Sequence, residues 1–129
     1  MKRDNSLQIE ILSIPHSQQR YETCGDYFTR NGVDIIAVSE LPDRRETLLV
    51  AIHELIEMAL CQIAGISNAS IDRFDMSPEY SDYEGEPGDL PAAPYYRQHQ
   101  IATGIERLLA AEMGVDWLTY ERHIQELAR

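Results

Sequence analysis

The sequence predicts an α+β fold, in which a small N-terminal antiparallel sheet packs on a long central helix and two further helices follow. Three observations support this: residues 1–40 carry strand and hairpin signals, residues 43–64 are an apolar stretch of helical length, and residues 94–128 repeat apolar side chains at helical spacing. A chain of 129 residues can bury one hydrophobic core without disulfide or metal cross-links, so we expect a single domain.

The strand signals begin where Leu7, Ile9 and Ile11 alternate with polar residues, which is typical of a strand with one buried face. Asn31-Gly32 then separates two stretches rich in aromatic and β-branched residues, and this dipeptide is a strong hairpin signal. We therefore expect the sheet to be antiparallel.

The central helix, residues 43–64, has clear end signals. Asp43 suits the N-cap position, Glu46 is placed to complete a capping box, and Gly65 is a favourable residue just past the end. A helix of this length has about six turns.

Three polar side chains, His53, Glu54 and Glu57, interrupt this apolar helix. Such a helix is expected to be buried, and buried charges are costly unless they are paired or bind a metal. At 100° per residue, Glu57 lies about 40° and Glu54 about 100° round the helix from His53. His53 and Glu57 thus have the spacing of two metal ligands in an H-E-x-x-E variant of H-E-x-x-H, with Glu54 in the position of the general base. The structural alternative is a helix with one partly exposed polar stripe.

Residues 66–93 are expected to form an acidic loop. They contain seven acidic residues against the single Arg73, together with several glycines and prolines. The calcium-loop pattern D-x-[DN]-x-[DN]-G is absent, so solvated carboxylates are the expected state, with a helical turn possible at residues 70–76.

Two helices are expected after the loop, at residues 94–113 and 116–128. Pro94 suits the first helical position, Gly114 the end of the first helix and Asp116 the cap of the second. The apolar faces are expected to be Ile101, Ile105, Leu108 and Leu109 on the first helix, and Trp117, Tyr120, Ile124 and Leu127 on the second.

A catalytic zinc site needs three protein ligands and an open position for water. His99 is the best candidate to join His53 and Glu57, because it lies near the start of a helix that can pack across the first. Glu106 is seven residues later, on nearly the same side, and could replace His99 or support a ligand from behind. Two histidines and a carboxylate suit zinc, and they also suit ferrous iron.

Other candidate ligands are less suitable. His16 and His123 are expected to be solvated, and Cys61 lies about 12 Å along the helix axis from His53, so packing is its expected role. With Cys24 it makes only two cysteines, far apart and without a C-x-x-C pair, which indicates free thiols.

The order of a sheet, an H-E-x-x-[HE] helix and a second ligand-bearing helix resembles the minimal zincin-like metallopeptidases, which include small uncharacterised phage and prophage proteins. The stretches VAIHELIEMALC and APYYRQHQIATGIERLLAAEMGVDW carry this resemblance, which extends over about residues 33–117. It implies a zinc metallopeptidase with His53, Glu57 and His99 as ligands and Glu54 as general base. Glu57 departs from the usual second histidine, and His99 stands where related members often have glutamate.

A peptide or protein substrate would follow from this activity. The stretch 33–39 could present a sheet edge to an extended peptide, and the acidic loop could cover the cleft. Candidate donors to the oxyanion are Tyr80, Tyr83, Tyr95 and Tyr96.

Two alternatives remain open. The chain could be a non-catalytic binding or accessory protein that keeps a metal-stabilised zincin-like scaffold. It could also be an all-α nucleotide pyrophosphohydrolase with Glu54 and Glu57 as its first E-x-x-E motif, but residues 112–116 are one residue too long for the second motif, and the strand signals oppose it.

The formal charge of −11 argues against nucleic acid and anionic membrane surfaces as partners. The first residues lack the apolar core of a signal peptide, and His53, Glu54 and Glu57 interrupt the longest apolar run, so we expect a cytoplasmic protein.

Overall fold

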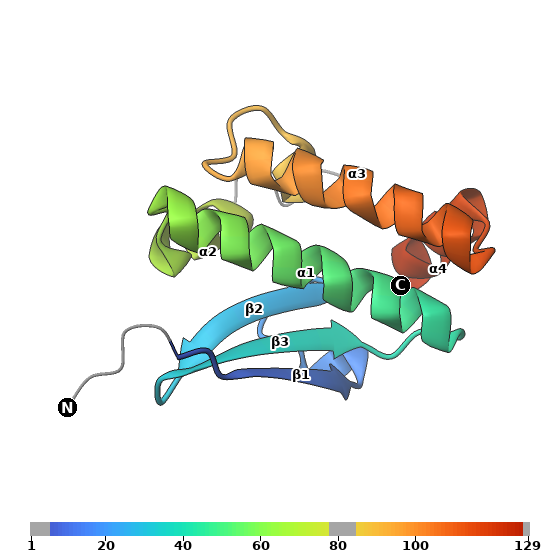
Figure 1. The fold of residues 1–129 in the computed structure, drawn as a ribbon, viewed down its shortest axis with the longest axis horizontal. Coiled ribbons are helices and arrows are strands. Elements are labelled where there is room, and N and C mark those ends of the chain that lie inside the picture. Colours follow the sequence, from blue (N-terminus) through green and yellow to red (C-terminus); the bar gives the residue numbers. More distant parts are fainter. Residues whose placement is uncertain (1–5, 78–84, 128–129) are drawn as a thin grey trace.

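The computed structural model describes residues 6–77 and 85–127, and it has the expected α+β class. Three strands precede four α-helices, and α1 lies across one face of the sheet with α3 alongside it on the side away from the sheet (Figure 1). The elements are β1 (Ile9–Ile14), η1 (His16–Gln18), β2 (Gly25–Arg30), β3 (Val33–Ser39), α1 (Arg44–Ala64), α2 (Asn68–Asp75), η3 (Pro87–Asp89), α3 (Tyr96–Met113) and α4 (Trp117–Leu127).

The sheet has the order β1-β3-β2. The hairpin prediction is confirmed: β2 and β3 are antiparallel, and Asn31 and Gly32 between them both have positive φ, 53° and 79°. The prediction of a wholly antiparallel sheet is wrong, because β1 runs parallel to β3. After β1 the chain crosses to the far edge and makes β2 before returning as β3, so β1 and β3 point the same way. An alternating pattern carries no information about that direction.

The edge strand β1 is also more exposed than its alternation suggests. Ile11 is 52% exposed and Leu12 is 44% exposed, whereas Ile36 and Val38 on the central strand β3 are fully buried. The core therefore lies between β3 and the helices, with Leu49 as one of its fully buried contributions from α1.

The ends of α1 agree with the capping signals. The Asp43 side chain accepts a hydrogen bond from the backbone N–H of Arg45 at 2.8 Å, and Gly65 ends the helix in the left-handed conformation with φ 75°. The expected capping box is wrong, because Glu46 is buried and its carboxylate hydrogen-bonds to His123 at 2.7 Å.

The two later helices deviate slightly from their expected ranges. Helix α3 starts two residues after Pro94, which lies in the preceding turn, and it ends at Gly114 with φ 73°. Asp116 caps α4 by accepting a hydrogen bond from the backbone N–H of Thr119 at 3.0 Å.

The expected acidic loop contains more regular structure than its composition indicated. Residues 68–75 form α2, which Ser67 caps through the backbone N–H of Ser70 at 3.1 Å, and residues 87–89 form the short helix η3. The helical turn expected at residues 70–76 is thus present as part of α2, η3 was not expected, and residues 78–84 lie outside the described part of the chain.

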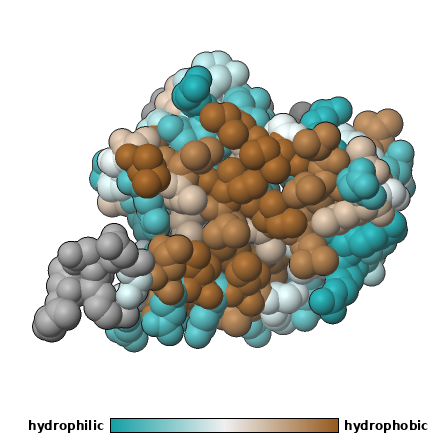
Figure 2. Space-filling model, in the orientation of Figure 1, coloured by the Kyte–Doolittle hydropathy of each residue, from teal (hydrophilic) through white to brown (hydrophobic). Residues whose placement is uncertain are grey.

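Helices α1 and α3 bury polar side chains beside apolar ones and leave several large apolar side chains exposed. On α1, His53 and Glu57 are 4% and 5% exposed, whereas Leu48 and Ile63 are 41% and 88% exposed. The alternative of a partly exposed polar stripe is thus wrong for His53 and Glu57, whereas Glu54 is half-buried. In Figure 2 an apolar surface extends over both helices.

The prediction that an apolar face buries α3 is wrong for most of that face. From its predicted apolar face Leu109 packs against the core, and the buried residues of the helix are His99, Ala102, Glu106 and Ala110. The exposed residues include Ile101, Ile105 and Leu108.

Helix α1 also has the length and composition of a membrane span, but the core helix of a soluble protein can meet the same criteria. Only 39% of its apolar stretch is buried within the fold.

Candidate functional site

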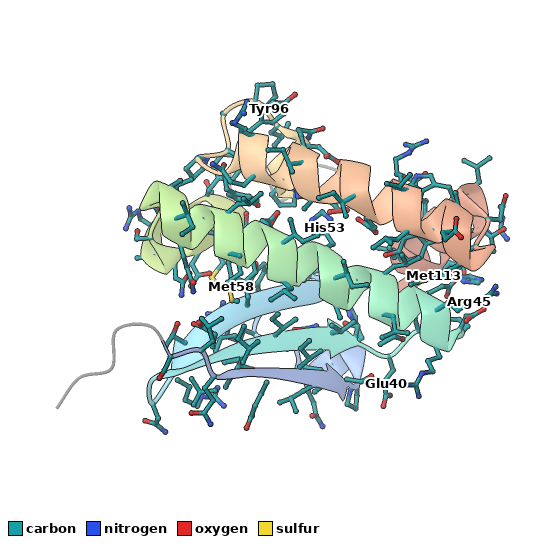
Figure 3. The ribbon with its side chains drawn as sticks, in the orientation of Figure 1. Glu40, Arg45, His53, Met58, Tyr96 and Met113 are labelled. Carbon is teal, nitrogen blue, oxygen red and sulfur yellow. The ribbon has the colours of Figure 1, made fainter. Side chains whose placement is uncertain are left out.

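Three side chains from α1 and α3 converge between the two helices. Glu57 Oε1 lies 2.8 Å from His99 Nδ1 and 3.5 Å from His53 Nε2, and the two histidine nitrogens are 3.2 Å apart. Figure 3 shows the His53 side chain between α1 and α3. Ligands of a tetrahedral ion at 2.0–2.2 Å are separated by about 3.3–3.6 Å, so small side-chain movements would place these atoms round one metal.

The Glu106 carboxylate contacts His53 on the ring nitrogen that points away from Glu57 and His99. This nitrogen, Nδ1, lies 2.7 Å from Glu106 Oε1, and the other oxygen of Glu106 accepts a hydrogen bond from Tyr120 at 2.5 Å. Metal-binding histidines commonly donate their far N–H to a carboxylate, which fixes the ring and its tautomer. Of the two roles left open for Glu106, this geometry favours support of His53 over replacement of His99.

A second carboxylate stands behind His99. Its Nε2 lies 3.1 Å from Asp89 Oδ1 and 3.5 Å from Glu86 Oε1. Gly88 makes this approach possible, since a Cβ atom there would lie 2.5 Å from Cγ of the His99 ring. Asp89 is exposed, as predicted for this loop, but it also contacts His99, which the sequence did not indicate. The sequence signal that could have indicated it is the Gly88-Asp89 pair shortly before the helix that carries His99.

Glu54 differs from the other carboxylates at the site, because no described residue forms a hydrogen bond or ion pair with it. It lines a cavity of about 870 Å³ that also reaches His53, Glu57 and His99. Burial raises the pKa of Glu54 well above its usual value. Gly25 on β2 leaves the space for this side chain, since a Cβ atom there would lie 2.8 Å from Glu54 Cγ. Glu54 is thus a carboxylate with free acceptor positions beside the convergent ligands.

The charges of the buried histidines depend on these carboxylates. Burial alone would lower the pKa of His53, but hydrogen bonds to Glu106 and Glu57 outweigh it and raise the pKa to about 12. Burial likewise opposes the charge of His99, and its hydrogen bond to Glu57 raises its pKa. For Glu57, hydrogen bonds to His53 and His99 outweigh the effect of burial and lower the pKa. Without a metal the site is therefore an ion-pair network of protonated imidazole and carboxylate.

Other groupings of possible ligands share His53. Atoms of His53, Glu86 and His99 lie within 4.8 Å of one another, and so do atoms of His53, Glu54 and Glu57. Glu54 and Glu86 thus border the same centre, from α1 and from the segment before η3.

The remaining candidate ligands lie outside this centre. His16 hydrogen-bonds to Ser39 at 2.8 Å and to Glu22 at 2.5 Å. His16 and His123 are half-buried and have partners, so the prediction that both are solvated is wrong. Cys61 is 1% exposed and packs in the core, where the Tyr27 hydroxyl donates to its sulfur at 3.6 Å, and both cysteines are free.

Two further predictions for a peptidase concerned a sheet edge for the substrate and tyrosine donors to the oxyanion. Strand β3 is the centre of the sheet, so it has no free edge for a peptide. Tyr95 donates its hydroxyl hydrogen to Asp75, and Tyr96 is 37% exposed at the start of α3. Tyr80 and Tyr83 lie outside the described residues.

Comparison of the chain with protein-family models, with curated proteins and with solved structures finds no match in any of the three.

Proposed function

We propose that this protein is a zinc-dependent hydrolase that cleaves peptide bonds, built on a zincin-like arrangement of sheet, H-E-x-x-E helix and ligand-bearing helix. One observation carries the proposal: Glu57 Oε1 lies 2.8 Å from His99 Nδ1 and 3.5 Å from His53 Nε2, while the neighbouring Glu54 carboxylate has no described partner. This donor set matches the two histidines and one carboxylate of several zinc hydrolases.

The arrangement assigns a role to each group. A bound zinc ion supplies a Lewis acid that polarises a carbonyl and makes a water molecule more acidic. Glu54 accepts the proton of the attacking water and delivers it to the leaving amine, which its high pKa favours. Glu106 and Asp89 would accept the hydrogen bonds of the outer ring nitrogens, so that the inward nitrogens of His53 and His99 can give up their protons to hold the zinc ion.

A direct test is metal analysis of the purified, natively folded chain. We expect about one zinc per chain, lost in His53→Ala and in His99→Ala. His123→Ala is the matched control, because His123 also pairs with a buried carboxylate, Glu46, but lies outside the centre. Folded wild-type protein that binds no zinc, or equal loss in the control, would overturn the metal assignment. Competition between Zn²⁺ and Fe²⁺ identifies the preferred ion.

The second candidate is an accessory protein in which the metal only stabilises the fold. The buried pairing of Glu57 with both histidines is compatible with such a role. Glu54→Gln separates the two functions. A hydrolase loses turnover of a peptide library in this variant while retaining zinc, whereas an accessory protein shows wild-type partner binding and no turnover in either form.

A further inference from the structure

Asp75 forms a second polar feature in the same cavity. It is the last residue of α2, and its two carboxylate oxygens accept separate hydrogen bonds from tyrosines that also line the cavity. The Tyr21 hydroxyl donates to Oδ2 at 2.9 Å, and the Tyr95 hydroxyl donates to Oδ1. The two donors hold the carboxylate in place and leave each oxygen with a further acceptor position.

Asp75 has no cationic partner among the described residues. Asp26 shows the contrast, because Arg20 binds both of its oxygens at 2.7 and 2.9 Å. Burial raises the pKa of Asp75 to about 6, because the charged form of this carboxylate is less stable in the fold than in water. A purely structural acceptor for two tyrosines would not need a charge.

Asp75 lies close to the centre formed by His53, Glu57 and His99. The Tyr95 ring that donates to Asp75 also packs edge-on against the His99 ring, with centroids 6.2 Å apart. A substrate group held at Asp75 would therefore be separated from His99 by one side chain. The end of α2 adds its carbonyl dipoles, which favour a cation at the same place.

The acidic side chains of the cavity wall also favour a cationic ligand. No lysine or arginine occurs among its described lining residues, whereas carboxylates come from several separate segments. They are Glu22, Asp26, Glu54, Glu57, Asp75, Glu86, Asp89, Glu106 and Glu121.

We propose that Asp75 is a specificity-determining residue that binds an ammonium or guanidinium group of the substrate, so that the proposed hydrolase acts on basic peptides. This inference rests on the proposed function for its reaction and on Asp75 for its selectivity. The cation could be a lysine or arginine side chain or a free α-amino group, because all three offer N–H donors to a carboxylate.

The test uses blocked hexapeptides that differ only at one central residue: lysine, arginine, or the neutral analogues norleucine and citrulline. We expect the zinc-loaded protein to prefer the cationic peptides by about ten- to a hundredfold in kcat/KM, the usual size of a charge-assisted hydrogen bond. Asp75→Asn should reduce that ratio to near one, mostly through the cationic peptides, and Asp75→Glu should restore part of it.

Asp72→Asn is the matched control. Asp72 lies one turn earlier on α2 and pairs with Arg20 at 3.2 Å, outside the residues that line the cavity. Its variant should keep the wild-type preference. A second peptide set with a free N-terminus distinguishes the α-amino group from the side chain as the source of the cation.

Equilibrium binding of the same peptides separates this inference from the proposed reaction. Binding that depends on Asp75 without cleavage would support the cation site and overturn the hydrolase. Cleavage without a preference for charge would support the hydrolase and overturn the cation site. Absence of binding to any cationic peptide, or a preference that survives in Asp75→Asn, would also overturn it.

Discussion

Glu106 on α3 hydrogen-bonds to Nδ1 of His53 on α1 at 2.7 Å, across the interface of the two helices. An ionised carboxylate only accepts hydrogen bonds, so this contact keeps a proton on Nδ1. When the ring becomes neutral, the proton is therefore lost from Nε2, which faces Glu57 and His99. The contact between α1 and α3 thus includes the carboxylate that holds the His53 ring.

We predict that Glu106→Gln weakens zinc binding by about 10–100-fold, because the amide has no charge to hold the imidazole in its required tautomer. Competition with a chromophoric chelator measures the change. Glu112→Gln, an exposed position on the same helix, should bind zinc as the wild type does. Equal affinities in all three proteins would contradict the supporting role of Glu106.

Tyr120 stabilises the same network from α4. Its hydroxyl donates to Glu106 Oε2 at 2.5 Å, and the side chain is fully buried. We predict that Tyr120→Phe lowers the free energy of unfolding by about 1–3 kcal/mol, since it leaves a buried charged oxygen without its donor. Urea denaturation of the metal-free protein measures this loss. A variant as stable as the wild type would mean that water replaces the hydroxyl.

Gly25 gives a way to displace Glu54 without changing it. A Cβ atom at Gly25 would lie 2.7 Å from Val50 Cγ1 and 2.8 Å from Glu54 Cγ, closer than side chains tolerate. We predict that Gly25→Ala costs about 1–3 kcal/mol of stability and reduces peptide cleavage while zinc stoichiometry stays near wild type.

Gly104→Ala is the control for this prediction, because a Cβ atom there has nothing within 4 Å. This position is inside α3, where alanine is the better helix former, so the control should gain about 0.5–1 kcal/mol and keep its activity. Full peptide cleavage by Gly25→Ala would show that the position of Glu54 is unimportant.

The sequence was sufficient for features that depend on neighbouring residues. The Asp43 cap, the Gly65 and Gly114 helix ends and the Asn31-Gly32 hairpin all follow from local backbone chemistry, and all were predicted. The convergence of His53, Glu57 and His99 needed one further assumption, that the two helices pack against each other.

Features that depend on distant segments could not be predicted in this way. Asp89 contacts His99 because η3 packs against α3, and its acidic surroundings in the sequence indicated solvent exposure but not this contact. The parallel pairing of β1 depends on the path of the chain after it. The buried polar side chains of α1 and α3 oppose the usual rule of burial, because the site lies in the interface of the two helices.

The high pKa of His53 predicts how zinc binding depends on pH. Burial lowers this pKa, but the hydrogen bonds to Glu106 and Glu57 raise it to about 12, so the ring is protonated at neutral pH in the metal-free protein. Zinc binds only the neutral ring, so the ring must lose a proton on binding. For each proton released, the apparent affinity for zinc should rise about tenfold per unit increase in pH. Affinity should therefore increase from pH 6 to pH 8.

Calorimetric titration in buffers with different ionisation enthalpies measures the number of protons released. Glu106→Gln should release fewer protons than the wild type, because it removes one of the two carboxylates that raise the pKa of His53 through a hydrogen bond. A binding heat that is the same in every buffer would mean that His53 is already neutral in the metal-free state. The effect of Glu106→Gln on proton release thus tests the His53 contact independently of its effect on affinity.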